Sequence, residues 1–235
     1  RLYSWDPPCL SLGYAQPFSD VDERALEKYQ WNVVRRPTGG RAILHTDELT
    51  YAIIAHKDEP VMEGGILESY KRLSKGLLLA LNLLQLTANA DKEYGLPDGQ
   101  QKNAPVCFEV PSNYEITVDG KKIIGSAQAR RQDGVLQHGS LPLTGDLTRI
   151  VSVLNLYGEN NRSVAAQKLL TRATTVENVS GKIITWEEAA EAFVAGFTQA
   201  LSITFYETNP TPQELKRADQ LAEEKYAHPS WIRRL

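Results

Sequence analysis

The chain has 235 residues, of which 42% are hydrophobic and 23% are charged, and its formal net charge is -3. This composition is ordinary for a globular protein, and the charge gives no general attraction to nucleic acid or to anionic membranes. No apolar run approaches the roughly 20 residues that cross a bilayer. The two cysteines, Cys9 and Cys107, lie far apart, which argues against a disulfide framework and against a zinc site. We therefore expect a cytoplasmic protein that binds no metal, no nucleic acid and no membrane.

The first third of the chain predicts strands and then a long helix. Residues 33–35, 42–45 and 49–55 are short apolar and β-branched runs around a Gly-Gly turn, which is typical of strands. Residues 64–86 carry apolar side chains at helical spacing. This spacing predicts an amphipathic helix with a broad apolar face.

The middle of the chain predicts a long loop and a β-hairpin. Residues 87–105 are polar and rich in Asn, Asp, Gly and Pro, which is typical of a loop. Asp119-Gly120 separates two alternating runs, 114–118 and 121–128, as in a hairpin with a tight turn. Another strand is expected at 134–143.

The last third predicts helices at 161–170, 186–201 and 212–225, with a strand at 203–206. Thr185 and Glu188 form a capping box at the start of the second of these helices. Strands in the middle and helices at the end predict an α+β fold, in which helices flank a mixed, largely antiparallel sheet. We expect one domain, residues 1–235, with the helices of 186–225 packing on the sheet.

A glycine pair, Gly39-Gly40, follows two arginines and precedes an expected strand. Adjacent glycines allow the backbone to approach a ligand closely, so that backbone amides can face a carbonyl, carboxylate or phosphate. A tight connection between two strands explains the same residues equally well.

Cys107 lies between prolines at the end of the expected long loop. A lone cysteine is more often a buried structural residue, but a nearby cation would lower its pKa and make it a nucleophile. Lys121 and Lys122 project to opposite faces of their strand, so one of them can point into a cleft. Cys9 has apolar neighbours and is expected to be structural.

Small residues follow Lys122, and two histidines lie on expected strands near glycines. Gly125, Ser126 and Ala127 leave room for a ligand beside their strand. His45 and His138 are the histidines best placed for a site. A Ser-His-Asp hydrolase is not supported, because the sequence has no Gly-x-Ser-x-Gly motif.

Three of these motifs, in this order, resemble the superfamily of lipoate–protein ligase A, biotin ligases and octanoyltransferases. They are Arg35-Arg36-x-Thr38-Gly39-Gly40, Lys122-x-x-Gly125-Ser126-Ala127-Gln128 and Gln137-His138-Gly139. The resemblance covers nearly the whole chain. It also implies that a strand and a helix of the family, which would precede Arg1, are missing.

The resemblance is closest to the octanoyltransferases that use a cysteine nucleophile. ATP-dependent lipoate ligases typically have a third glycine where this sequence has Arg41, and a His-Asp-x-Gly-Asn stretch where it has His45-Thr46-Asp47. The sequence around Cys107 also resembles the transferases rather than the ligases.

The resemblance implies transfer of an octanoyl group from octanoyl-acyl carrier protein to a lysine of a lipoyl-domain protein, such as the glycine cleavage H protein. Cys107 would be the nucleophile and Lys122 would lower its pKa, with no cofactor. The residues that would bind substrate are Arg36, Thr38, Gly39, Gly40, Arg41, His45, Gly125, Ser126, Ala127, Gln128, His138 and Gly139. Three alternatives remain: an ATP-dependent lipoate ligase, an amidotransferase that moves lipoyl or octanoyl groups between proteins, and an inactive binding protein that retains the fold.

Overall fold

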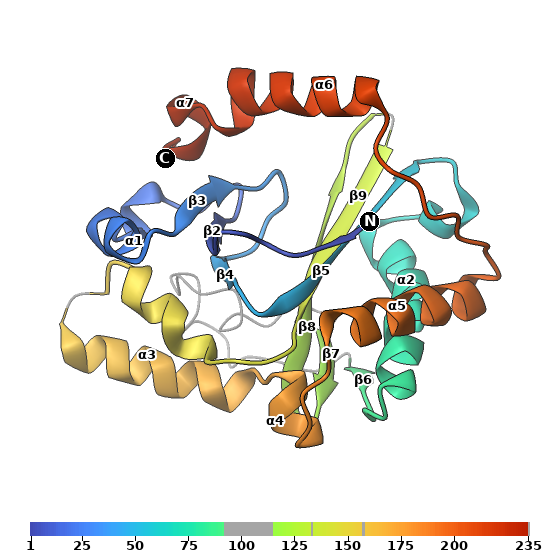
Figure 1. Cartoon of the computed structure of the whole chain (residues 1–235), viewed down its shortest axis with the longest axis horizontal. Helices are drawn as coiled ribbons and strands as arrows, with labels where there is room; N and C mark the ends of the chain where they lie inside the picture. The colour runs from blue at the N-terminus through green and yellow to red at the C-terminus, as the bar shows by residue number, and fades with distance from the viewer. Residues whose placement is uncertain (92–114, 133, 157, 235) are drawn as a thin grey trace.

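The computed structural model describes residues 1–91, 115–132, 134–156 and 158–234. Two β-sheets lie side by side, and helices cover their outer faces (Figure 1). The described chain therefore has the expected α+β architecture, although its strands are divided between two sheets rather than joined in one.

The larger sheet has six strands and is antiparallel in every pair. Its strands, in spatial order, are β1 (Leu2–Tyr3), β5 (Glu48–His56), β9 (Gly134–Pro142), β8 (Lys121–Arg130), β7 (Glu115–Val118) and β6 (Asn89–Asp91). The hairpin between β7 and β8 turns at Asp119 and Gly120, whose φ angles of 49° and 74° are both positive. Positive φ at both central residues is the requirement of the turn that the Asp-Gly pair predicts.

The smaller sheet has three strands and carries the glycine pair at one end. In spatial order they are β3 (Asn32–Arg35), β2 (Cys9–Leu12) and β4 (Ile43–His45). Strand β2 runs parallel to β3 and antiparallel to β4, so the loop from β3 to β4, residues 36–42, passes over the end of β2.

The helices divide between the two sheets. The α-helices are α1 (Glu23–Tyr29), α2 (Ile66–Leu83), α3 (Glu159–Arg172), α4 (Val176–Ser180), α5 (Trp186–Leu201), α6 (Pro212–Leu221) and α7 (Pro229–Ile232). Other helical segments are the 3-10 helices η1 (Phe18–Asp20), η2 (Pro60–Met62) and η4 (Leu147–Val153) and the π-helix η5 (Ala222–Tyr226). Helices α2 and α5 lie against the larger sheet, α1 and α3 lie beside the smaller one, and α6 crosses above both (Figure 1).

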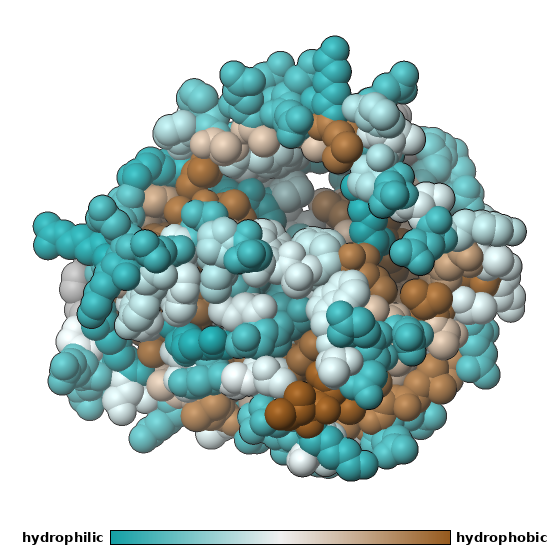
Figure 2. Space-filling view, in the orientation of Figure 1, coloured by the Kyte–Doolittle hydropathy of each residue, from teal (hydrophilic) through white to brown (hydrophobic). Residues whose placement is uncertain are grey.

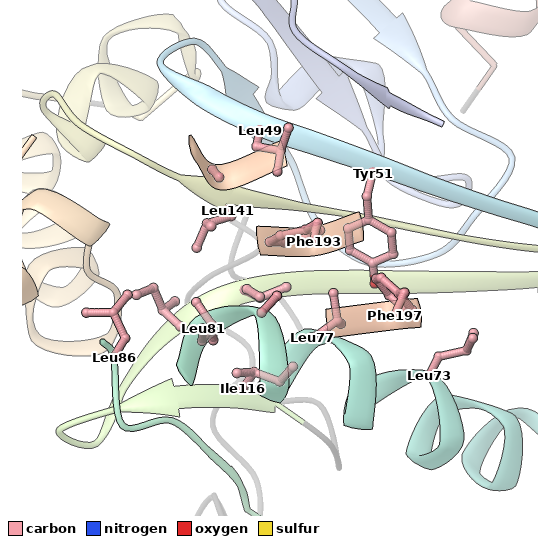
Figure 3. Packing of buried hydrophobic residues seen from close by; sticks show 14 of the residues in the cluster. Leu49, Tyr51, Leu73, Leu77, Leu81, Leu86, Ile116, Leu141, Phe193 and Phe197 are labelled. Carbon is pink, nitrogen blue, oxygen red and sulfur yellow. The ribbon is translucent and has the colours of Figure 1, made fainter. Parts of the chain in front are cut away.

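The main core lies between the larger sheet and helices α2 and α5. Tyr51 of β5 extends toward Phe193 and Phe197 of α5, and leucines of α2 close the other side (Figure 3). The two helices approach closely because Gly76 of α2 faces Gly196 of α5. The Thr185–Glu188 capping box, which the sequence predicts, begins α5.

The structure corrects the prediction at three places. Residues 203–206 form no strand; they are exposed and follow Ser202, whose left-handed conformation ends α5. Strand β6 lies within the expected loop 87–105, of which residues 92–105 are outside the described part. In the expected C-terminal segment 186–225, α5 is part of the core, whereas α6 has no buried residue.

The surface in the view of Figure 2 is mostly hydrophilic over α6 and more hydrophobic around α4 and α5. Ile183, between those two helices, is among the exposed apolar residues. Among the described helices, none is both long enough and apolar enough to cross a membrane.

Candidate active site

The two motifs of the larger sheet lie side by side. Strands β8 and β9 pair so that Ala127 is opposite His138 and Ser126 is opposite Gly139. Directly opposed residues share a face of the sheet, so His138 and Ala127 point away from the helices α2 and α5. Two motifs that are separate in the sequence therefore form one surface.

A β-bulge decides where Lys122 points. In the pairing of β7 with β8, Thr117 lies opposite Lys122 and Ile116 lies opposite Ile124, so Ile123 is an extra residue in β8. An extra residue interrupts the alternation of side chains along a strand. From Ile123 onward, the side chains of β8 therefore point to the faces opposite to those that uninterrupted alternation from Lys122 would give.

The exchange places Lys122 on the same face as Gly125 and Ala127. Uninterrupted alternation would have placed Lys122 with Ser126 and Gln128, toward the helices. We call the side away from α2 and α5 the polar face. The polar face of the described strands includes Glu115, Thr117, Lys122, Gly125, Ala127, His138 and Ser140.

Lys122 is buried and paired, whereas Lys121 is exposed. The Nζ atom of Lys122 lies 2.8 Å from Oε1 of Glu115, and the two side chains are only 6% and 9% exposed. The sequence predicts that the two lysines point to opposite faces, and the structure shows that Lys122 is the buried one.

Other expected site residues lie on the opposite side of the sheet. Ser126 forms a 2.6 Å hydrogen bond with the hydroxyl of Tyr51, across the gap that Gly139 leaves in the central strand. Gln128 donates hydrogen bonds to Ser69 of α2 and to Gln137. The side chains of Ser126 and Gln128 thus stabilise the contact between sheet and helices.

Arg36 organises the Gly-Gly loop from within. Its guanidinium donates hydrogen bonds to the carbonyl oxygens of Ser11, Gly39 and Arg41, at 2.8, 2.9 and 2.8 Å. Two of these carbonyls belong to the loop itself, and that of Ser11 belongs to strand β2. The buried Arg36 guanidinium therefore holds the loop in one shape.

The glycines in the loop and next to it differ in how much room they leave for a side chain. A Cβ atom on Gly13 would lie 1.9 Å from the carbonyl oxygen of Gly40, so the loop packs directly on the backbone after β2. Gly40 has a φ of 94°, which side chains disfavour. A Cβ atom on Gly39 would have no neighbour within 4 Å. The exposed side of Gly39 is therefore open to a ligand.

Thr38 connects the loop to the polar face. Its Oγ1 atom lies 2.7 Å from Nε2 of His138. Burial, together with the nearby Arg36 and His45, lowers the pKa of His138 to about 4. His138 is consequently neutral at physiological pH and can either donate to Thr38 or accept from it.

His45 is part of a buried polar cluster beside this connection. Its Nδ1 atom lies 2.6 Å from Oε1 of Glu48, and its ring stacks on Trp5 with centroids 4.4 Å apart. Trp5 in turn donates to Thr50, which donates to the same Glu48 oxygen. The cluster fixes the end of β4 against β5.

The remaining expectations concern the cysteines, Arg41 and metals. Cys107 lies outside the described residues. Burial raises the pKa of Cys9 to about 12, so this thiol is unreactive, as expected for a structural residue. Arg41 is a half-buried residue of the loop. Within the described ranges, no group of His, Cys, Asp and Glu side chains could hold a metal ion.

Sequence reasoning missed three residues of the polar face, Glu115, Thr117 and Ser140. Glu115 lies in β7, the first strand of the hairpin, two residues before Thr117. Because alternate residues of a strand share a face, this spacing was the signal that could have placed Glu115 on the face of Lys122. Ser140 lies opposite Gly125, and its Oγ atom is buried without a hydrogen-bond partner among the described residues. A substrate atom could satisfy this hydroxyl.

Comparison with known proteins identifies the family. Residues 1–198 match the Lipoyl protein ligase A/B catalytic domain. A protein of Carboxydothermus hydrogenoformans named Octanoyltransferase LipM is 38% identical over 235 residues, which cover 99% of this chain and 85% of the relative. A protein of the same name from Moorella thermoacetica is 39% identical over 236 residues, covering 100% of this chain and 85% of the relative.

Solved structures share the fold. A bi-partite lipoate protein ligase from Thermoplasma acidophilum, studied with its E2 lipoyl domain, has a TM-score of 0.81 at 24% identity, covering 99% of this chain and 82% of that one. Lipoate-protein ligase A bound with ATP has a TM-score of 0.78 at 24% identity, covering 99% and 84%. The chain therefore belongs to the Lipoyl protein ligase A/B catalytic domain family, and it is an acyltransferase.

Proposed function

We propose that the protein transfers an octanoyl group from octanoyl-acyl carrier protein to a lysine of a lipoyl-domain protein, such as the glycine cleavage H protein, in the cytoplasm. The support from comparison is that near-full-length relatives are named Octanoyltransferase LipM. The observation that carries the chemistry is the buried Lys122, which the bulge turns toward the same face as Gly125, Ala127 and His138.

The proposed reaction has two steps through a thioester on Cys107. The thiolate of Cys107 attacks the donor thioester, and the carrier protein leaves as its thiolate. The amine of the acceptor lysine then attacks the enzyme thioester, which yields an amide and restores the thiol. Covalent catalysis suits this exchange because the donor is already activated, so no ATP is required.

The described residues would divide the work. The ammonium of Lys122 would stabilise a thiolate and exchange a proton with the reacting groups. Backbone amides of the Gly39-Gly40 loop or of residues 126–128 would stabilise the tetrahedral oxyanion. Gly125 and Ala127 have no bulky side chains, so the octanoyl chain could lie against them. Arg36 would act indirectly, by fixing the shape of the loop.

Intact-protein mass spectrometry tests this proposal. Wild-type protein mixed with octanoyl-acyl carrier protein, without ATP, should gain one octanoyl group that hydroxylamine removes. The Cys107→Ser variant should gain no adduct, or one that resists hydroxylamine, and Cys107→Ala should transfer nothing to the acceptor. Cys9→Ser is the matched control, and its adduct should equal that of the wild type.

Other outcomes would favour the alternatives. Product that forms only with free acid and ATP would indicate an ATP-dependent lipoate ligase. Acylation from an octanoylated or lipoylated protein, but not from the carrier protein, would indicate an amidotransferase. Tight binding of both proteins without any adduct would indicate an inactive binding protein.

A further inference from the structure

Glu115 and Lys122 form an ion pair within the larger sheet. The two residues come from neighbouring strands, and their side chains meet within the sheet at 2.8 Å between Oε1 and Nζ. Both side chains are more than nine-tenths buried. Solvent therefore screens their attraction far less than it screens a surface pair.

The geometry of the strands makes this contact specific. Glu115 and Thr117 share a face of β7 because they are two residues apart. Thr117 lies directly opposite Lys122, so Glu115 is its diagonal neighbour on the polar face. Without the extra residue Ile123, Lys122 and the small residues that follow in β8 would lie on opposite faces of the strand. The bulge thus brings Glu115, Lys122 and the small residues to one surface.

A buried ion pair is weak support for stability alone. Removing two charges from water costs several kcal/mol per ion, and well-packed apolar residues often stabilise a fold equally well. The pair has a clear chemical consequence instead. A carboxylate in direct contact favours the charged form of an amine and directs one of its N–H groups.

We propose that Glu115 is a positioning residue for the acyl transfer: it holds Lys122 as an ammonium ion with Nζ fixed on the polar face. This inference rests on the proposed function. In the second step, the ammonium of Lys122 gives its proton to the departing sulfur and takes one from the attacking nitrogen. The products are an amide and a thiol, and Lys122 returns to the ammonium form that Glu115 stabilises.

Glu115→Gln tests the role of the charge, because glutamine keeps the shape and a hydrogen-bond acceptor. We expect kcat for transfer to the acceptor to fall about 10- to 100-fold, by analogy with the residues that orient the ligands of metal sites. KM for the acyl donor should stay unchanged. The alkaline limb of the pH–rate profile should move to lower pH, since the ammonium loses its stabilising carboxylate.

A double-mutant cycle tests whether Glu115 acts through Lys122. Lys122→Gln should abolish most of the activity, and adding Glu115→Gln should cause no further loss. Glu23→Gln is the matched control, because it makes the same chemical change in an exposed ion pair with Arg233. Its kcat and pH profile should be those of the wild type.

The outcomes separate this inference from the proposed function. A wild-type protein that does not transfer octanoyl groups contradicts the proposed function itself. An active wild type, with a Glu115→Gln variant of unchanged rate and pH profile, overturns only the role of Glu115, as do additive losses in the cycle. If Glu115→Gln does not fold, Glu115→Asp decides: it keeps the charge but moves the carboxylate one methylene away from Nζ, so a fall in kcat at unchanged KM supports the positioning role and an unchanged kcat overturns it.

Discussion

Thr38 and His138 join the two sheets through one hydrogen bond, 2.7 Å long, between Oγ1 and Nε2. Thr38 belongs to the loop that follows β3, and His138 lies in the centre of the larger sheet. Because Arg36 fixes the rest of the loop, this bond sets the position of the Gly-Gly backbone over the polar face.

Thr38→Val should separate this role from that of side-chain volume. Valine has the same shape but no hydroxyl, so the buried His138 nitrogen loses its partner. We expect the free energy of unfolding to fall by about 1–3 kcal/mol and the transfer rate to fall as well. Thr38→Ser keeps the hydroxyl and should retain most of both. Urea unfolding measures the change in stability, and the transfer assay measures the change in rate. A Thr38→Val variant with the stability and rate of the wild type would contradict the prediction.

Gly139→Ala should disrupt the sheet, whereas Gly39→Ala should not. A Cβ atom at position 139 would lie 2.3 Å from the carbonyl oxygen of Gly125 and 2.8 Å from Ser126 Oγ. Overpacking of this kind costs about 1–3 kcal/mol. At position 39 the same atom meets nothing within 4 Å, so stability should be unchanged. Thermal unfolding compares the two variants, and lower activity of a stable Gly39→Ala protein would indicate that a substrate approaches this loop.

Gly196→Ala should destabilise the protein, although alanine is the better helix former. A Cβ atom at position 196 would lie 2.6 Å from the carbonyl oxygen of Gly76 and from the backbone nitrogen of Ala80. The clash forces α5 away from α2, and this loss exceeds the gain of about 1 kcal/mol in helix propensity. A melting temperature equal to or above that of the wild type would show that the two helices are not in this close contact.

Titration of His138 should lower stability in acid. Its folded-state pKa of about 4 is below the ordinary value of 6.5, so the unfolded chain binds the extra proton first as pH falls. The free energy of unfolding should therefore decrease from pH 6.5 to pH 4, by up to about 3 kcal/mol. Denaturant unfolding of the wild type and of His138→Gln measures this slope. The variant should lack this contribution, and equal slopes in the two proteins would contradict the assignment to His138.

The sequence predicted those turns and helix ends that depend on only a few neighbouring residues. Asp119-Gly120 specifies its turn through φ angles alone, and Thr185 with Glu188 specifies the start of α5. The strand expected at 203–206 was wrong because β-branched and aromatic residues form a strand only where a partner strand is available. In the described structure these residues lie between α5 and α6 instead.

The sequence offered candidate residues for the site, but it did not indicate the directions of their side chains. The motifs around Gly125 and His138 were recognised separately, and their pairing across two strands confirms that they lie together. Nothing in the residue types indicated that Arg36 would bind backbone carbonyls, or that Ser126 would face the helices. Such directions depend on register, which long-range pairing determines.

The bulge at Ile123 divides β8 into two parts, and the alternation of side chains in one part is offset by one residue from that in the other. The polar face is continuous along β8 only because of this offset, which puts Lys122 before the bulge on the same face as Gly125 and Ala127 after it. Deleting Ile123 would restore uninterrupted alternation along β8 and turn Lys122 toward α2 and α5. Every other residue of the site would remain in the sequence. The interval between Lys122 and Gly125 is thus a part of the site in its own right, and its length determines which residues of β8 share a face.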